Sequence, residues 1–263
     1  MHVLGLGRPS DLLLVDEIDA SRYGDLVTRR AARVPLQHLT GSVGFRYLEL
    51  EVGPGVFVPR PETESVVQWA VDSVSGLEKP LMVDLCTGSG TIAFALANEV
   101  PGATVHAVER DPAALEWAAR NAQNRVRAGD PAVQLHLASV EDAVPELDGT
   151  VDLVASNPPY VAITERHLSE PEVIDHDPEI ALFAGEDGLD VIRLVERAAH
   201  RLVRPGGLVV VEHSDRQGQS APAVFAQAGG WHEIADHDDL TGRPRFVTAR
   251  REGADAQGGE LSR

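Results

Sequence analysis

The segment LMVDLCTGSGTIAFALANEV, residues 81–100, indicates the class of fold. Its first part, Leu81–Cys86, has the length of a buried strand and begins with the apolar run Leu81–Val83, and Thr91–Val100 follows as a helix. Between them, Gly88 and Gly90 let the backbone turn tightly and pass close to a ligand. A strand, a glycine turn and a helix in this order predict an α/β sheet with a binding site at the end of this strand.

Strand and helix patterns alternate along most of the remaining chain. A helix is expected from Glu62 to about Ser75, before the first strand. The other expected strands are Thr104–Glu109, Val133–Leu137, Val151–Ser156, Gly207–His213 and Phe246–Arg250, and the other expected helices are Ala113–Arg127, Leu189–Leu202 and Gln219–Ala228. This alternation predicts a parallel sheet with helices on both faces. A hairpin-like turn at Thr241–Pro244 suggests that the last strand runs antiparallel.

The chain before residue 61 has a different pattern. Residues 1–40 indicate short helices, the last of which ends near Arg33, before Pro35. Phe45–Val52 alternates apolar and polar residues like a hairpin strand, with its turn expected at Gly53–Gly55. The chain is thus divided into a helical segment (1–40), a β-hairpin linker (41–60), an α/β domain (61–251) and a disordered tail (252–263).

Charge and composition disfavour several classes of function. The 263 residues include 41 acidic and 23 basic ones, for a formal net charge of −18. Because binding to a phosphate backbone relies on Lys and Arg, no direct nucleic-acid binding is expected, and a protein or small-molecule partner is favoured. The single cysteine, Cys86, excludes an intramolecular disulfide, and no apolar run has the length of a membrane span. A cytoplasmic location without a membrane partner is expected, and the histidines show no metal-ligand spacing.

The glycine turn is suited to a cationic ligand. Asp84 precedes the glycines and would repel a pyrophosphate, whereas it would attract the amino group of S-adenosylmethionine. Glu109 closes the next strand, where a carboxylate can accept both ribose hydroxyls of an adenosine. The electrostatics therefore favour S-adenosylmethionine over NAD as the cofactor.

A second loop, Asn157-Pro158-Pro159-Tyr160, directly follows the strand Val151–Ser156. Ligands of open α/β sheets bind beyond the carboxyl ends of strands, so this loop should face the glycine turn. The Asn157 side-chain oxygen and a proline carbonyl can accept both hydrogens of a planar NH₂ group. Such a pair of acceptors would aim the nitrogen at the methyl group of the cofactor. The loop therefore predicts an N-methyltransferase.

These loops and several other segments resemble a known family. An Asn-Pro-Pro-Tyr loop after the fourth strand is typical of class I methyltransferases that act on exocyclic or amide nitrogens. More narrowly, about residues 30–251 are similar to the PrmC/HemK family, whose members methylate the glutamine of the Gly-Gly-Gln motif in peptide chain release factors. The matching segments are PLQHLTG (35–41), VPRPETE (58–64), DPEIAL (177–182), Gly185, Gly188-Leu189, PGG (205–207), Glu212-His213 and DLTGRPRF (239–246).

The resemblance implies a fold, a reaction and roles for individual residues. The fold would be the Rossmann-like α/β fold of class I S-adenosylmethionine-dependent methyltransferases, with a seven-stranded, mostly parallel sheet behind a short helical segment and a β-hairpin. The reaction would be methyl transfer to the amide nitrogen N5 of the release-factor glutamine. The implied cofactor-binding residues are Asp84, Thr87, Gly88, Ser89, Gly90, Glu109, Arg110 and Asn157. The implied substrate-binding residues are Arg60, Pro61, Glu62, Asn157, Pro158, Pro159 and Tyr160, of which Asn157, Pro158 and Tyr160 are also catalytic.

The chain departs from the family pattern in three places. The family usually has a larger N-terminal helical domain, so residues 1–40 are expected to be a truncated substrate-docking segment. The acidic residue that commonly reaches the adenine is replaced by Ser139-Val140, with Glu141 and Asp142 just after, and the adenine contact stays unassigned. Cys86 stands where glycine is more usual and is expected to be a small packed residue instead of a nucleophile.

Three other functions compete with amide methylation. An N-methyltransferase acting on an exocyclic amino group of a nucleic-acid base shares the two-donor geometry, but the net charge of −18 argues against it. A cofactor-binding protein without catalysis would not need the Asn157–Tyr160 loop. A nicotinamide oxidoreductase is disfavoured by Asp84.

Overall fold

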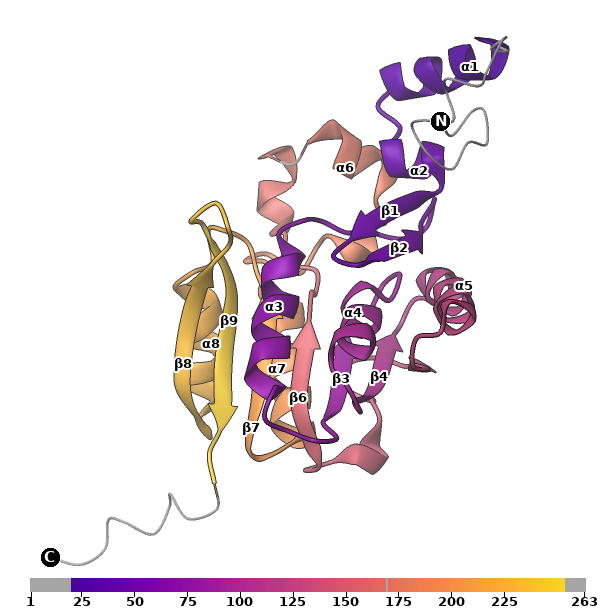
Figure 1. Ribbon diagram of the computed structural model, residues 1–263. Helices are drawn as coiled ribbons and strands as arrows, with labels where there is room; N and C mark the ends of the chain where they lie inside the picture. Colours follow the sequence, from indigo (N-terminus) through magenta and orange to yellow (C-terminus); the bar gives the residue numbers. More distant parts are fainter. Residues whose placement is uncertain (1–19, 169, 254–263) are drawn as a thin grey trace, which may run out of the picture.

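A seven-stranded sheet forms the centre of the computed structural model, which describes residues 20–168 and 170–253 (Figure 1). The strand order is β5-β4-β3-β6-β7-β9-β8. The strands are β3 (Leu81–Leu85), β4 (Thr104–Glu109), β5 (Gln134–Leu137), β6 (Val151–Ser156), β7 (Val203–Glu212), β8 (Trp231–Asp238) and β9 (Pro244–Arg251). Neighbours from β5 to β7 are parallel, whereas β9 is antiparallel to both β7 and β8. The expected seven-stranded, mostly parallel sheet is confirmed.

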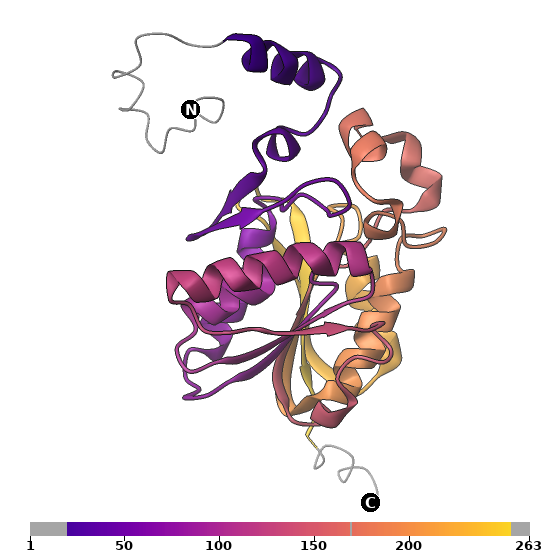
Figure 2. The ribbon, with the colours of Figure 1, turned by 90° about the vertical axis from the view of Figure 1, so that its right-hand side faces the viewer.

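Helices cover both faces of this sheet (Figures 1 and 2). The helices α3 (Thr63–Val74), α4 (Thr91–Glu99) and α5 (Pro112–Ala128) lie on one face, and α7 (Asp190–Leu202) and α8 (Ser220–Ala228) lie on the other. Successive strand residues point to opposite faces. Accordingly, Met82 packs into the core beneath α3 and α4, while Val83 packs into the core beneath α7.

The edge strand β8 is the one strand of the sheet that the sequence pattern did not predict. Its ladder with β9 is irregular between His232 and Ala235, where Glu233 has a φ of 51°. A bulge shifts the side chains that follow it and so breaks the alternation from which a strand is predicted. An edge strand also tolerates polar residues on both faces.

The hairpin differs from the one that the sequence predicted. It consists of β1 (Ser42–Phe45) and β2 (Leu48–Glu51), so the expectation of one strand over Phe45–Val52 with its turn at Gly53–Gly55 is wrong. The turn lies at Arg46-Tyr47, although Arg46 must adopt a φ of 49° that disfavours a side chain. Its guanidinium Nε donates to Glu99 Oε1 of α4 at 2.6 Å. This ion pair between the hairpin and α4 offsets the strain of the turn. A local sequence pattern does not predict the pair.

Several small elements lie beyond the carboxyl ends of the parallel strands (Figure 1). They are the hairpin, α1 (Ala20–Ala31), α2 (Leu36–Thr40) and α6 (Pro171–His176). Arg30 of α1 pairs with Glu172 of α6 at 2.6 Å. The helical prediction for residues 1–19 and most of the tail predicted to be disordered lie outside the described residues. Within the described ranges, no helix is both long enough and apolar enough to cross a membrane.

Candidate active site

The two predicted loops begin side by side because of the strand order. β3 pairs with β4 on one side and with β6 on the other, so the chain changes direction across the sheet between β3 and β6. Leu85 of β3 is in register with Ser156 of β6. The Ser156 hydroxyl donates to the Leu85 carbonyl at 2.7 Å and fixes the two strand ends together. The loops that start at Cys86 and Asn157 therefore leave the sheet at the same level.

A cavity of about 400 Å³ opens between these loops. The predicted site residues that line it are Arg60, Asp84, Thr87, Gly88, Ser89, Glu109, Arg110, Asn157, Pro158, Pro159 and Tyr160. Three other predicted residues, Pro61, Glu62 and Gly90, are not part of the lining. Val140 and Glu141, from the stretch where the adenine contact was left unassigned, also line the cavity.

Asp84 is a buried carboxylate in the cavity wall, with 1% of its surface exposed. Its Oδ2 accepts hydrogen bonds from the Thr87 hydroxyl and from the Ala93 amide. Its Oδ1 is buried and has no hydrogen-bond partner among the described residues. Burial raises the pKa of Asp84 to about 7, against the opposing effect of these two hydrogen bonds. An unpartnered carboxylate oxygen in this position is suited to a cationic group.

Glu109 fastens the glycine turn to the next strand. Its Oε2 accepts from the Gly88 amide at 2.9 Å, and its Oε1 accepts from the amides of Arg110 and Asp111. A carboxylate offers about four lone-pair sites, and the three amides occupy three of them, so one site remains for a hydroxyl donor. Glu109 thus holds the loop in place and keeps the capacity to bind a ribose.

The backbone of the glycine turn explains why position 90 is a glycine. Gly90 has a φ of 91°, and a Cβ there would lie 2.0 Å from the Phe94 ring.

Cys86 also has a positive φ, of 60°, at the position where glycine is more usual. Burial is the main cause that raises the pKa of the Cys86 thiol, so the neutral form is favoured. A neutral thiol is a poor nucleophile.

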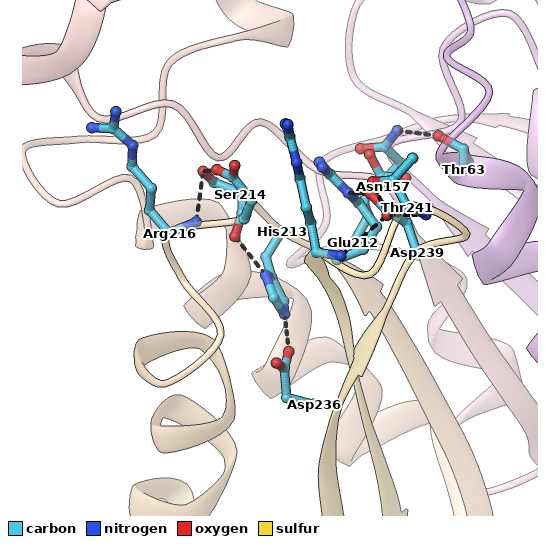
Figure 3. A network of polar contacts seen from close by, with 12 residues as sticks. Thr63, Asn157, Glu212, His213, Ser214, Arg216, Asp236, Asp239 and Thr241 are labelled. Carbon is cyan, nitrogen blue, oxygen red and sulfur yellow. Dashed lines mark hydrogen bonds and ion pairs between the residues drawn. The ribbon is translucent and has the colours of Figure 1, made fainter.

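Asn157 is held by α3 (Figure 3). Its Nδ2 donates to the hydroxyl of Thr63 at 3.1 Å. Within residues 20–168 and 170–253, no group donates to its Oδ1. The neighbouring Tyr160 donates its hydroxyl to Glu212 Oε1 at 3.1 Å. The free amide oxygen of Asn157 therefore remains available in a wall of the same cavity as Asp84.

Two acidic residues beside the site, neither of which lines the cavity, had no role assigned from the sequence. Asp177 Oδ2 accepts from Arg60 at 2.8 Å, and the Arg60 guanidinium lies 4.9 Å from the centre of the Phe57 ring. This ion pair joins the segments 58–64 and 177–182, which were matched to the family separately. Glu212 contacts Tyr160 as described above. The position of Glu212 at the end of an apolar strand, like that of Glu109, was the signal that could have identified it.

The backbone around Tyr160 is packed closely against Gly188. Gly188 has a φ of 73°, and a Cβ there would lie 2.4 Å from the Tyr160 carbonyl oxygen. We expect Gly188→Ala to lower the free energy of unfolding by roughly 2–4 kcal/mol, because backbone strain and overpacking add. Urea unfolding measures this change.

Gly149 provides a matched control for Gly188. It has a similar φ of 69°, but nothing lies within 4 Å of an added Cβ. Gly149→Ala should therefore cost only about 1 kcal/mol, from backbone strain alone. Equal losses in the two variants would contradict a specific role for the contact with Tyr160.

Comparisons with known proteins agree with this geometry. Residues 79–246 match the model of a family described as "Methyltransferase domain". The release factor glutamine methyltransferase of Streptomyces coelicolor is 58% identical over 233 residues, which cover 88% of this chain and 81% of that protein. The 4-amino-L-phenylalanine/4-methylamino-L-phenylalanine methyltransferase of Streptomyces pristinaespiralis is 44% identical over 80% of this chain and 71% of that protein.

A solved structure shows the same fold at low sequence identity. A methyltransferase from Pyrococcus furiosus superposes with a TM-score of 0.54 at 17% identity, covering 89% of this chain and 99% of that one. At this identity the likeness concerns the fold alone.

Proposed function

The chain belongs to the release factor glutamine methyltransferases, and from this premise we propose that it methylates N5 of the glutamine in the Gly-Gly-Gln motif of peptide chain release factors. The methyl donor is S-adenosylmethionine, which supplies an electrophilic methyl group on a sulfonium. The observation that carries the proposal is the orientation of Asn157. Its NH₂ is engaged by Thr63, which leaves Oδ1 as a free acceptor in the cavity that Asp84 also lines.

The residues of the glycine turn fit the proposed cofactor. The unpartnered Oδ1 of Asp84 would accept a hydrogen bond from the amino group, and the remaining acceptor site of Glu109 would accept one from a ribose hydroxyl. Thr87, Gly88 and Ser89 line the cavity between them. The remaining implied cofactor ligand, Arg110, lies at the exposed rim of the cavity.

The loop residues would orient the substrate without a strong base. Asn157 Oδ1 and the Pro158 carbonyl would accept the two hydrogens of the glutamine amide, and Tyr160 would pack beside it. Accepting these hydrogens raises the electron density on a nitrogen that is otherwise a poor nucleophile and stabilises its developing positive charge. No histidine of the described residues lines the cavity. We infer that Asn157 and Pro158 act by positioning, and that the proton leaves to solvent or to a carbonyl.

The small elements beyond the carboxyl ends of the parallel strands are candidates for docking the protein substrate. The described part of residues 1–40, α1 and α2, lies beyond the same strand ends from which the two loops leave (Figure 1). Arg60, Pro61 and Glu62 lie between these elements and α3, and only Arg60 lines the cavity. We propose that Pro61 and Glu62 contact the factor outside the cavity.

Transfer of a labelled methyl group tests the proposed function. Purified enzyme is incubated with labelled S-adenosylmethionine and a release factor, either intact or with the Gly-Gly-Gln glutamine changed to alanine. Label on the intact factor alone is the expected result. Label on both factors would place the methyl group on another residue and would contradict the proposal.

Two further acceptors separate the competing functions in the same assay. RNA tests the rival N-methyltransferase that acts on nucleic-acid bases. 4-Amino-L-phenylalanine tests the acceptor named for the Streptomyces pristinaespiralis relative. Label on either acceptor, with none on the release factor, would overturn the proposal in favour of that acceptor class.

A further inference from the structure

Glu212 is a buried carboxylate behind the substrate loop. It is the last residue of β7, and its neighbour Val211 is in parallel register with Ser156, which precedes Asn157. Glu212 therefore stands next to Asn157 at the end of the sheet, with 1% of its surface exposed. Burying a carboxylate costs free energy unless it is paired or hydrogen-bonded, so its presence calls for an explanation other than packing.

Burial raises the pKa of Glu212 to about 7, and its polar neighbours partly oppose this effect by favouring the charged form. Its Oε1 accepts from the Tyr160 hydroxyl at 3.1 Å. Its Oε2 has no hydrogen-bond partner of regular geometry among the described residues, while the Thr63 hydroxyl lies close enough to favour the carboxylate. Arg245 also favours the charge and is itself held by Asp239, with its Nε 3.2 Å from Oδ2.

In its charged form, which prevails above pH 7, the Glu212 carboxylate dictates the direction of the neighbouring hydrogen bonds. It can only accept, so the hydroxyl hydrogens of Tyr160 and Thr63 are drawn toward Glu212. The lone pairs of Thr63 Oγ1 then face Asn157, which has to present its NH₂ group, in agreement with the 3.1 Å contact. Figure 3 shows the Asn157 side chain joined to the Thr63 hydroxyl, and the Asn157 oxygen is consequently the atom left for the substrate.

We propose that Glu212 is a positioning residue whose acceptor-only carboxylate, acting through Thr63 and Tyr160, holds Asn157 with its oxygen toward the acceptor nitrogen. The inference rests on the proposed function, because only a substrate with an NH₂ group needs the Asn157 oxygen to point toward it. With a glutamine at position 212, an NH₂ group can face Thr63. The Thr63 hydroxyl hydrogen is then free to turn toward Asn157 and to favour the flipped amide.

The variant Glu212→Gln separates positioning from packing. Glutamine has nearly the same volume, so a merely structural role would be preserved and the unfolding temperature maintained or raised. We expect kcat on the release factor to fall roughly tenfold to hundredfold, with the unfolding temperature not lowered and the cofactor Kd unchanged. Glu196→Gln is the matched control. Glu196 is also buried, at 5% exposed, and accepts from an aromatic side chain, Trp231, but it belongs to α7 and its partner to the edge strand β8, away from the loop that begins at Asn157.

A double-mutant cycle tests the proposed route through Thr63. Thr63→Val removes the hydroxyl at constant volume, and Thr63→Ser restores it. Positioning through Thr63 predicts that adding Glu212→Gln to Thr63→Val lowers kcat little further, and that Thr63→Ser recovers much of the activity. The side-chain amide signals of Asn157 in a ¹⁵N NMR spectrum should shift in Glu212→Gln and not in Glu196→Gln. This measurement does not depend on catalytic activity.

The outcomes distinguish this inference from the proposed function. Absence of label on the release factor with wild-type enzyme would overturn the proposed function. Wild-type activity with an unchanged kcat in Glu212→Gln would overturn the role of Glu212 alone. Fully additive losses in the cycle, or unchanged Asn157 signals, would also overturn it. Even if Glu212→Gln fails to fold, an unchanged kcat in Thr63→Val would overturn the inference, because positioning through Thr63 requires its hydroxyl.

Discussion

Replacing Asn157 with alanine is expected to lower kcat on the release factor by roughly 10²–10³-fold, the usual cost of removing one preorganised polar group at a reacting centre. Asn157 Oδ1 is the free acceptor beside the cavity, and the amide is fixed from behind by Thr63. Alanine removes the acceptor and leaves the glutamine nitrogen without one of its two contacts. The lone pair of the nitrogen then stays more delocalised into the amide carbonyl, and the nitrogen is less well aligned with the methyl group of the cofactor.

The loss should appear mainly in kcat because the contact strengthens as charge develops on the nitrogen. Steady-state kinetics with varied release factor and a separate cofactor-binding measurement check this expectation. Asn98→Ala is a suitable control, since Asn98 is an exposed asparagine of α4 whose Nδ2 donates to Asp130 at 3.0 Å. An Asn157→Ala enzyme with wild-type kcat would show that another group holds the acceptor nitrogen.

The loops of the site could be located from the sequence because their signals are local. A buried strand, a glycine turn and a helix succeed one another within residues 81–100, and Asn157 directly follows an apolar strand. In a parallel sheet all carboxyl ends meet at one edge, so the strand pattern alone brings Asp84, Glu109 and Asn157 to the same side. The register of Leu85 with Ser156 confirms that the two loops start side by side.

The parts that were missed depend on contacts between distant segments. The hairpin turn at Arg46-Tyr47 is held by Glu99 of α4, which a local pattern of turn residues cannot reveal. Glu212 had been matched to the family, but its partner Tyr160 lies 52 residues earlier in the chain. Its role follows only from the parallel register of β6 and β7, which places two strand ends together.

Cofactor binding is expected to depend on pH through Asp84. Its pKa of about 7 in the free protein means that the carboxyl is mostly protonated at pH 6. A cationic amino group binds the carboxylate, so binding must displace this proton. Below pH 7 the apparent Kd for S-adenosylmethionine should therefore rise roughly tenfold for each unit of pH, and above pH 7 it should level off. Titration calorimetry in buffers of different ionisation enthalpy measures both the Kd and the released proton.

The variant Asp84→Asn should remove this pH dependence and weaken cofactor binding by roughly 10–100-fold, the typical value of a charge-assisted hydrogen bond. The same substitution should weaken cofactor binding but increase the stability of the free protein. A carboxyl whose pKa is raised on folding contributes stability that is fully present below its unfolded pKa of about 4 and is lost as the pH rises through about 7. Asp84→Asn should therefore raise the free energy of unfolding of the free protein at pH 8 and leave it nearly unchanged at pH 4. A variant that binds the cofactor as tightly as the wild type, with the same pH profile, would show that Asp84 does not hold the amino group.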